Sequence, residues 1–238
     1  MSGLTNDTVL YILGSGTDGS TNILDTGKGA NCPHAITTVG TIQIDTAQYK
    51  FAPSSILFDG AGWLLLDDSA DWDFGTGDFT IDTFLKRSET GTVRHNIFGQ
   101  GNAGLTGGYH LGYISASIGT LALGTFVFGM NDETYNPKTS GVIVDTNWHH
   151  IAVVRSGNNL MVALDGTFGS TVDVTGQTYT NSPTKFGVGT LGEFNYSVHE
   201  GWMQGFRITR KALWTADFTP PIAPATATPI MRAIMISD

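Results

Sequence analysis

The sequence predicts a single domain built as an all-β sandwich of two antiparallel sheets. Three observations predict this class. Short apolar segments of high β-propensity recur about every ten residues, glycine-rich turns separate them, and no window of about 12 residues has the periodicity of an amphipathic helix. The composition agrees, because 31 glycines, 13 phenylalanines and only 14% charged residues in 238 residues suit short strands joined by tight turns.

Eleven segments are predicted as strands. They are residues 9–13, 36–44, 55–58, 63–66, 79–85, 109–114, 121–128, 141–144, 150–155, 160–164 and 206–209. In the segment 79–85 apolar and polar residues alternate over most of the run, so one face of that strand is predicted to line a core. Asp165-Gly166 directly follows the segment 160–164 and predicts a two-residue hairpin turn, since such turns need positive φ angles.

The C-terminal part differs from the rest. Residues 211–214 are a short helix candidate, and the prolines Pro220-Pro221 stop any continuation. The sandwich is therefore assigned to residues 1–221, and residues 222–238 are assigned to an extended segment. Two interpretations of that segment stay open: a final strand that closes the sheet, or an arm that docks on a neighbouring subunit by strand addition. The apolar side chains of such an arm are Ile230, Met231, Ile234, Met235 and Ile236.

Charge and hydropathy exclude two classes of partner. Twelve basic against 21 acidic residues give a formal charge of −9, which repels nucleic acid. No apolar run approaches the roughly 20 residues of a membrane helix.

Cys32 stands alone, so no internal disulfide is possible, and the first residues lack the pattern of a signal peptide. The protein is expected to be made in a reducing cytoplasm.

Three stretches in a fixed order carry a family resemblance. The first comprises residues 55–64 (SILFDGAGWL) and 71–81 (DWDFGTGDFTI). The second comprises residues 147–155 (NWHHIAVVR) with Leu164-Asp165-Gly166, and the third comprises residues 205–215 (GFRITRKALWT) with 218–221 (FTPP). Together they resemble the laminin-G-type concanavalin-A-like lectin/glucanase domain, particularly the version in bacteriophage virion proteins. The resemblance covers residues 8 to about 221.

The resemblance implies a jelly-roll sandwich of two curved sheets. In that fold Trp148, Ile151 and Val153 are expected to point toward the core between the sheets, as are Phe206 and Ile208 on the final strand. Arg207 is expected to face outward, and Phe218 to plug an edge before the prolines.

Catalysis is not expected. Glucanases of this fold carry a Glu-x-Asp-x-x-Glu strand that places two carboxylates on one concave face. The four glutamates of this chain are Glu89, Glu133, Glu193 and Glu200, and none has that spacing from an aspartate. Cys32 has no obvious activating partner, and the adjacent His149 and His150 point to opposite faces of a strand, so they cannot chelate one metal together.

Calcium is the one cofactor that the resemblance suggests, because lectin-like members of the family often bind it through loop carboxylates. Asp18 and Asp25 flank a loop in which carboxylate and carbonyl oxygens could converge. The alternative is that both aspartates cap turns. The acidic residue that completes such a site in the family has no counterpart at Met203-Gln204-Gly205.

Aromatic residues near loops are candidates for a sugar-stacking platform, because tryptophan and tyrosine pack their apolar planes on pyranose faces. These candidates are Tyr135, Tyr179, Tyr196 and Trp202. The alternative for each of them is burial in the core or in an interface.

The sequence therefore favours a non-catalytic structural protein of a phage particle, either a capsid decoration subunit or a tail-associated protein. Its expected partners are other virion proteins and further copies of itself. Its expected location is the virion, after synthesis in the host cytoplasm. The alternative is a carbohydrate-binding lectin that adheres to host or environmental glycans.

Overall fold

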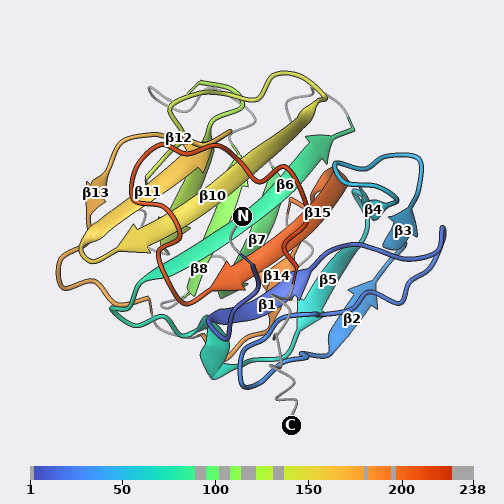
Figure 1. Ribbon diagram of the computed structural model, residues 1–238, viewed down its shortest axis with the longest axis horizontal. Coiled ribbons are helices and arrows are strands. Elements are labelled where there is room, and N and C mark those ends of the chain that lie inside the picture. Colours follow the sequence, from blue (N-terminus) through green and yellow to red (C-terminus); the bar gives the residue numbers. More distant parts are fainter. Residues whose placement is uncertain are drawn as a thin grey trace, which may run out of the picture.

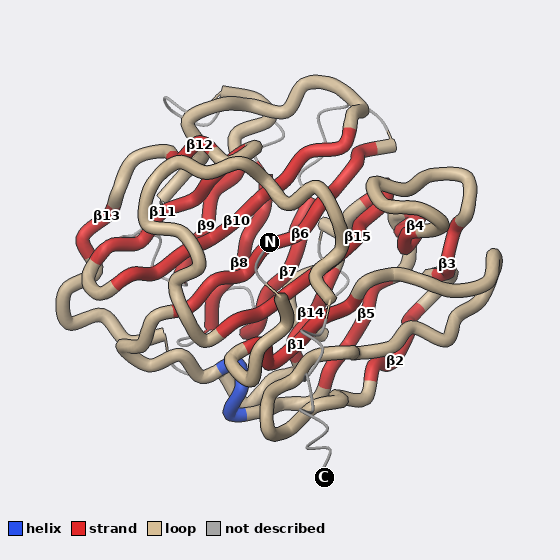
Figure 2. Tube along the Cα trace, in the orientation of Figure 1, coloured by secondary structure: helices blue, strands red, loops and turns tan. Residues whose placement is uncertain are grey.

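Two antiparallel sheets pack face to face in the computed structural model, which describes residues 3–88, 95–101, 108–113, 122–130, 137–179, 182–193 and 197–226. Figure 1 shows one sheet in front of the other, and Figure 2 shows the strands linked by long loops. The single helical element in that part is the 3-10 turn η1 (Ala70–Trp72). The predicted all-β sandwich is confirmed.

The front sheet has nine strands, with the path β12-β11-β10-β6-β15-β4-β3; β1 also pairs with β15, and β13 with β11. Its members are β1 (Thr8–Ile12), β3 (Gln43–Asp45), β4 (Ser55–Asp59), β6 (Phe79–Arg87), β10 (Trp148–Ser156), β11 (Asn159–Leu164), β12 (Thr167–Phe168), β13 (Val172–Asp173) and β15 (Glu200–Thr209). The last strand among the described residues, β15, therefore lies in the interior of the sheet.

The back sheet has six strands in the order β2-β5-β14-β7-β8-β9. They are β2 (Ile36–Val39), β5 (Trp63–Leu66), β7 (His95–Gly101), β8 (Gly108–Tyr113), β9 (Phe126–Met130) and β14 (Phe186–Val188).

Aromatic rings fill the space between the sheets. Phe206 of β15 lies 5.7 Å from Phe98 of β7 and 6.2 Å from Phe186 of β14, centroid to centroid. Phe79 of β6 stacks on Phe74 at 4.3 Å. Each large side chain of this kind contributes roughly 1.5–3 kcal/mol when it is buried, so this interior holds the two layers together.

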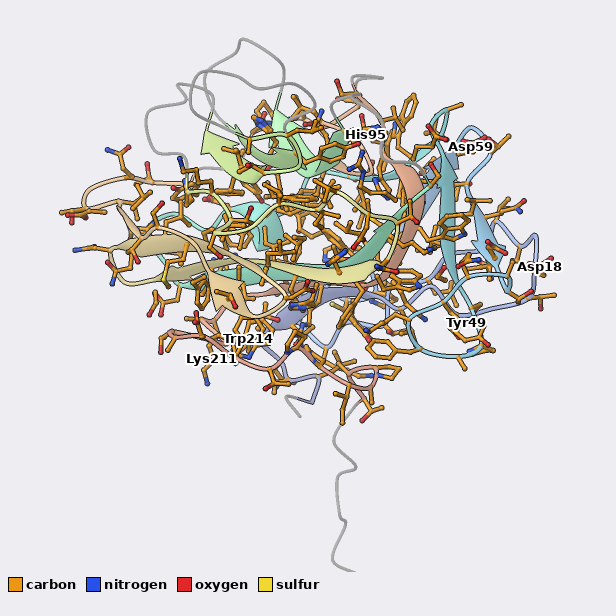
Figure 3. All side chains as sticks on the ribbon, turned by 90° about the horizontal axis from the view of Figure 1, so that it is seen from above. Asp18, Tyr49, Asp59, His95, Lys211 and Trp214 are labelled. Carbon is orange, nitrogen blue, oxygen red and sulfur yellow. The ribbon has the colours of Figure 1, made fainter. Side chains whose placement is uncertain are left out.

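The outer face of the front sheet is partly covered by the chain that follows β15. Phe218 stacks on Trp214 at 4.0 Å, and the pair packs on Ala152 and Val154 of β10. Figure 3 places Trp214 on the outer side of the front sheet. Phe218 thus covers the face of the sheet, whereas the sequence predicted that it would plug an edge.

Several predicted elements differ from the structure. The expected strand 36–44 is two strands in different sheets, β2 and β3, because the chain turns at Gly40, where φ is 70°. Residues 141–144 and the expected helix 211–214 are irregular, and β9 begins at Phe126. The turn at Asp165-Gly166 is confirmed, with φ values of 50° and 85°.

Candidate functional site

A row of partly exposed side chains crosses the outer face of the front sheet. Strand pairing places Trp148 of β10 opposite Lys86 of β6, and Lys86 opposite Trp202 of β15. The same register continues to Leu57 of β4 and Gln43 of β3. All five side chains are intermediate in exposure. We call Trp148, Lys86 and Trp202 the tryptophan row.

Alternation along the strands sends these side chains outward. Ile151 and Val153 of β10 belong to the core between the sheets, so Trp148, an odd number of residues away, faces the other side. The prediction that Trp148 points into the core was wrong for this reason. The predictions for Ile151 and Val153 are confirmed, as are those for Phe206 and Ile208.

The polar groups of the row are fixed by neighbours. The Lys86 ammonium lies 5.9 Å from the centroid of the Trp202 ring and donates a hydrogen bond to the carbonyl oxygen of Thr146. The indole N–H of Trp202 donates to Oδ2 of Asp45. These contacts hold both side chains in place, which suits a preorganised binding surface.

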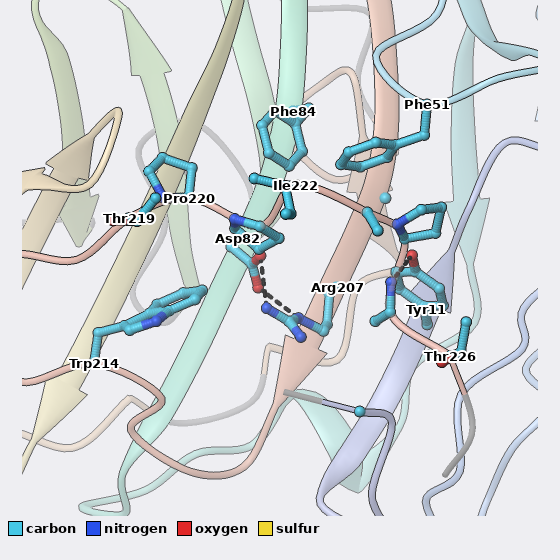
Figure 4. Close-up of a pocket in the computed structure, with 16 residues that line it drawn as sticks. Tyr11, Phe51, Asp82, Phe84, Arg207, Trp214, Thr219, Pro220, Ile222 and Thr226 are labelled. Atoms are coloured by element: carbon cyan, nitrogen blue, oxygen red, sulfur yellow. Dashed lines mark hydrogen bonds and ion pairs between the residues drawn. The ribbon is translucent and has the colours of Figure 1, made fainter. Parts of the chain in front are cut away.

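A second feature, a cavity of about 530 Å³, lies on the same face (Figure 4). Residues 219–226, which we call the C-terminal strap, run across it. The strap is tied down at its end, because the Ala225 N–H donates to the Tyr11 hydroxyl at 3.0 Å and the Leu4 N–H donates to the Thr226 carbonyl at 2.9 Å. Burial raises the pKa of Tyr11, which keeps that hydroxyl neutral.

The floor of the cavity carries a buried ion pair. Arg207 donates from Nε to Oδ1 of Asp82 at 2.8 Å and from Nη2 to Oδ2 at 2.9 Å, as Figure 4 shows. Nε2 of His150 lies 3.2 Å from Oδ2 of the same carboxylate. Burial alone would raise the pKa of Asp82, but the charge of Arg207 and the hydrogen bonds from His150 and Arg207 outweigh it and lower that pKa. Arg207 points away from the core as predicted, yet it is only 3% exposed because the strap covers it.

A loop separates the cavity from the tryptophan row. The side-chain amide of Gln204, between Trp202 and Arg207 on β15, accepts from the Lys50 and Phe51 N–H groups and donates to the Phe51 carbonyl. This contact fixes the loop over β15. The Phe51 ring then meets Phe84 edge-on at 5.1 Å and closes one side of the cavity.

Of the four predicted platform aromatics, the structure describes two. Trp202 lies in the tryptophan row. Tyr179 is a core residue, 1% exposed and packed edge-on against Phe79 at 5.7 Å, so it does not contribute to an exposed platform. Tyr135 and Tyr196 lie outside the described residues, as do the arm residues Ile230, Met231, Ile234, Met235 and Ile236. The described start of the C-terminal segment, residues 222–226, packs on its own sheet as part of the strap.

The two aspartates considered for calcium each hold a turn. Oδ1 of Asp18 accepts from the N–H and the hydroxyl of Thr46, and Figure 3 shows Asp18 at one end of the molecule. Asp25 accepts three backbone N–H bonds, and it lies beside Cys32 and His34 rather than in a cluster with Asp18.

Two stacked antiparallel sheets with an aromatic interior and a covered outer face define a concanavalin-A-like β-sandwich. A family model matches residues 58–217, and the chain belongs to this family, the concanavalin A-like lectin/glucanases superfamily. A comparison with curated protein sequences finds no match. In the part of the chain that the structure describes, no helix is long and apolar enough to cross a membrane.

Solved structures with similar folds include toxin binding domains and one domain of an arabinanase. The binding domain of Paraclostridial Mosquitocidal Protein 1 is similar with a TM-score of 0.64 and 15% identity, over 88% of this chain and 50% of that one. Domain 4 of an extracellular arabinanase from Geobacillus stearothermophilus, in complex with arabinotriose, is similar with a TM-score of 0.62 and 17% identity, over 87% and 94%. The binding domain of botulinum neurotoxin DC, in complex with rat synaptotagmin II, gives 0.61 and 16%, over 88% and 50%. This chain thus spans about half the length of the toxin binding domains.

Proposed function

We propose that this chain is a non-catalytic carbohydrate-binding domain and that an oligosaccharide binds along the tryptophan row. The observation that carries the proposal is the placement of Trp148 and Trp202 on either side of Lys86, in register and partly exposed on one sheet face. It makes carbohydrate recognition, which was the alternative from the sequence, the main function proposed here.

The chemistry of the row suits a sugar chain. Tryptophan rings offer flat apolar faces to the C–H faces of pyranose or furanose rings. The indole N–H of Trp202 is engaged by Asp45, which fixes that ring for stacking. Adjacent strands are about 4.8 Å apart, so two tryptophans separated by one strand lie roughly 10 Å apart. A ligand that contacts both is therefore extended, and Lys86 and Gln43 supply polar partners beside it.

The absence of catalysis is also part of the proposal. The buried carboxylate nearest the cavity, Asp82, is engaged by Arg207 and His150, and its pKa is lowered. A group in that state is a poor general acid, since a catalytic acid needs a pKa raised toward the working pH. The arabinotriose complex of the similar arabinanase domain supports sugar as the ligand class.

The test is a glycan array followed by calorimetric titration of any binder. We expect Trp148→Ala and Trp202→Ala each to weaken binding by about tenfold or more, which corresponds to about 1.4 kcal/mol. Trp63→Ala is the matched control, because Trp63 is also partly exposed but lies on the outer face of the back sheet. An array without a binder, or equal losses in all three variants, would refute the proposal.

The setting on a virion is a separate proposal. It is supported by the phage-like order of the sequence motifs and by the apolar composition of residues 230–236. Co-sedimentation of the purified protein with particles that lack it tests this setting, and a failure to bind such particles would count against it without affecting the glycan proposal.

A further inference from the structure

Three side chains that can bind metal ions converge beside β1. The ligand atoms of Asp25, Cys32 and His34 all lie within 4.8 Å of one another. Across the described residues this is the one group of three or more His, Cys, Asp or Glu side chains that come this close together. None of its members belongs to the tryptophan row.

The loop that carries the cluster is anchored on β1. The Lys28 and Gly29 N–H groups donate to the Thr8 carbonyl at 2.8 and 2.9 Å. Oδ1 of Asp25 accepts from the N–H groups of Tyr11 at 2.9 Å and Gly27 at 2.7 Å. Metal-binding carboxylates are themselves hydrogen-bonded in this way, which fixes their orientation.

His34 is oriented from its other side. Its backbone N–H donates to Oδ2 of Asp25 at 2.8 Å, and its Nε2 lies 2.9 Å from Oδ2 of Asp71. The ring also packs against Trp72, with 4.6 Å between centroids. With Nε2 engaged by Asp71, Nδ1 is the nitrogen left for an ion. A carboxylate behind a histidine is the usual support of a metal-binding imidazole.

Cys32 completes the set. Its Sγ lies 3.1 Å from the carbonyl oxygen of Val9, to which the thiol donates. A carboxylate oxygen of Asp25 lies within 4.8 Å of this sulfur, and its negative charge favours a bound cation. A Cβ at position 27 would come within 2.6 Å of Sγ and 3.0 Å of Oδ1 of Asp25, so only glycine leaves the space beside the ligands open.

We propose that Asp25, Cys32 and His34 form a binding site for a thiophilic divalent cation of the zinc type, with Asp71 as the positioning residue for His34. Thiolate, imidazole and carboxylate together are the ligands of zinc, whereas calcium takes oxygen ligands. Three protein ligands leave a fourth position for water. Zinc–ligand distances are about 2.0–2.3 Å, so binding draws the three side chains slightly inward. The thiol loses its proton to solvent as the metal–sulfur bond forms, one proton per ion.

Cobalt(II) is the spectroscopic probe. Titration of the purified, chelator-treated full chain is expected to give a thiolate-to-cobalt charge-transfer band that saturates at one ion per chain and disappears when zinc is added. Cys32→Ser is expected to abolish the band. His34→Gln and Asp25→Asn are expected to weaken cobalt binding at least tenfold, and Asp71→Asn about 10–100-fold, as for other groups that support a ligand.

His149→Gln is the matched control, because His149 also lies between two carboxylates, Asp145 and Asp165, but has no cysteine beside it. It is expected to leave cobalt binding unchanged. Zinc should also raise the melting temperature of the native chain but not that of Cys32→Ser, because only a ligand that binds the folded state stabilises it. No band with the native chain, or a band of equal affinity in His34→Gln, would overturn the proposal; the latter would indicate binding by a lone thiolate.

Discussion

Asp82 of β6 and Arg207 of β15 form a two-pronged ion pair on the outer face of the front sheet, with N–O distances of 2.8 and 2.9 Å and side-chain exposures of 5% and 3%. The strap and Trp214 cover the pair, and the Arg207 guanidinium lies 5.7 Å from the Trp214 ring. This buried ion pair joins two inner strands of the sheet, β6 and β15, beneath the strap.

Breaking this pair is expected to be costly. Arg207→Met leaves the Asp82 carboxylate buried without its main partner, and such losses amount to about 3–5 kcal/mol in the free energy of unfolding. Urea denaturation measures the change. The double variant Asp82→Leu/Arg207→Met removes both charges and should recover part of the loss. A double variant that is less stable than Arg207→Met alone would contradict this account.

The hairpin turn between β11 and β12 gives a second prediction. Gly166 has a φ of 85°, and a Cβ there would lie 1.8 Å from the Phe218 carbonyl oxygen. Gly166→Ala is therefore expected to cost about 2 kcal/mol or more, from left-handed backbone strain together with displacement of the strap. Gly157→Ala is the control, because Gly157 also has positive φ but open space around it. Equal losses of stability in the two variants would show that the contact with Phe218 is unimportant.

A buried histidine predicts how stability depends on pH. Burial lowers the pKa of His199 to about 3, with smaller contributions from the charges of His95 and Arg87. The unfolded chain protonates His199 near pH 6.5, whereas the folded chain does not until about pH 3. Stability should therefore fall as the pH drops below about 6.5, by up to roughly 1.4 kcal/mol per pH unit from this one group.

The comparison is between the native chain and His199→Gln, by urea denaturation from pH 7 to pH 4. The variant is expected to lose less stability over this range, whatever its stability at pH 7. The same pH dependence in both proteins would rule out His199 as the source.

Removal of residues 222–238 tests the strap. The truncated chain loses the hydrogen bonds from Ala225 to Tyr11 and from Leu4 to Thr226, worth about 1 kcal/mol each, and exposes the wall of the cavity. We expect a folded but less stable domain, because the core between the sheets does not include these residues. Thermal melting measures the stability, and sedimentation compares the oligomeric state with that of the full chain. An unfolded product would assign the segment to the fold itself.

Local signals account for what could be predicted of the fold. The turn at Asp165-Gly166 was predictable because a two-residue hairpin turn needs positive φ angles, which favour an Asp-Gly pair. The strand β7 was missed since His95–Gly101 contains three polar side chains and two glycines and is buried throughout, so no alternation identifies it. The split of residues 36–44 depends on Gly40. A Cβ at this position would lie 2.6 Å from the Ala61 carbonyl oxygen, so a residue with a side chain would clash there.

The candidate sites depend on pairing between distant strands. Trp148 and Trp202 meet across Lys86 only because β6 lies between β10 and β15, an arrangement that no local pattern reveals. The cluster of Asp25, Cys32 and His34 lies within ten residues of sequence, and the spacing Cys-x-His was a signal that could have been followed. Their convergence still required the path of the loop over β1.

The central position of β15 constrains how the molecule is made. Among the described strands, β1 pairs only with β15, and β4 pairs with β15 and the short β3. The paired residues lie 194 to 201 positions apart in the sequence for β1 and 141 to 147 for β4, so both strands are synthesised long before β15. Until that partner is synthesised, the front layer cannot close, and long-range pairing of this kind slows folding. The native state is therefore expected to form late in synthesis and in a nearly cooperative step. A nascent chain stalled before residue 200 would remain vulnerable to aggregation.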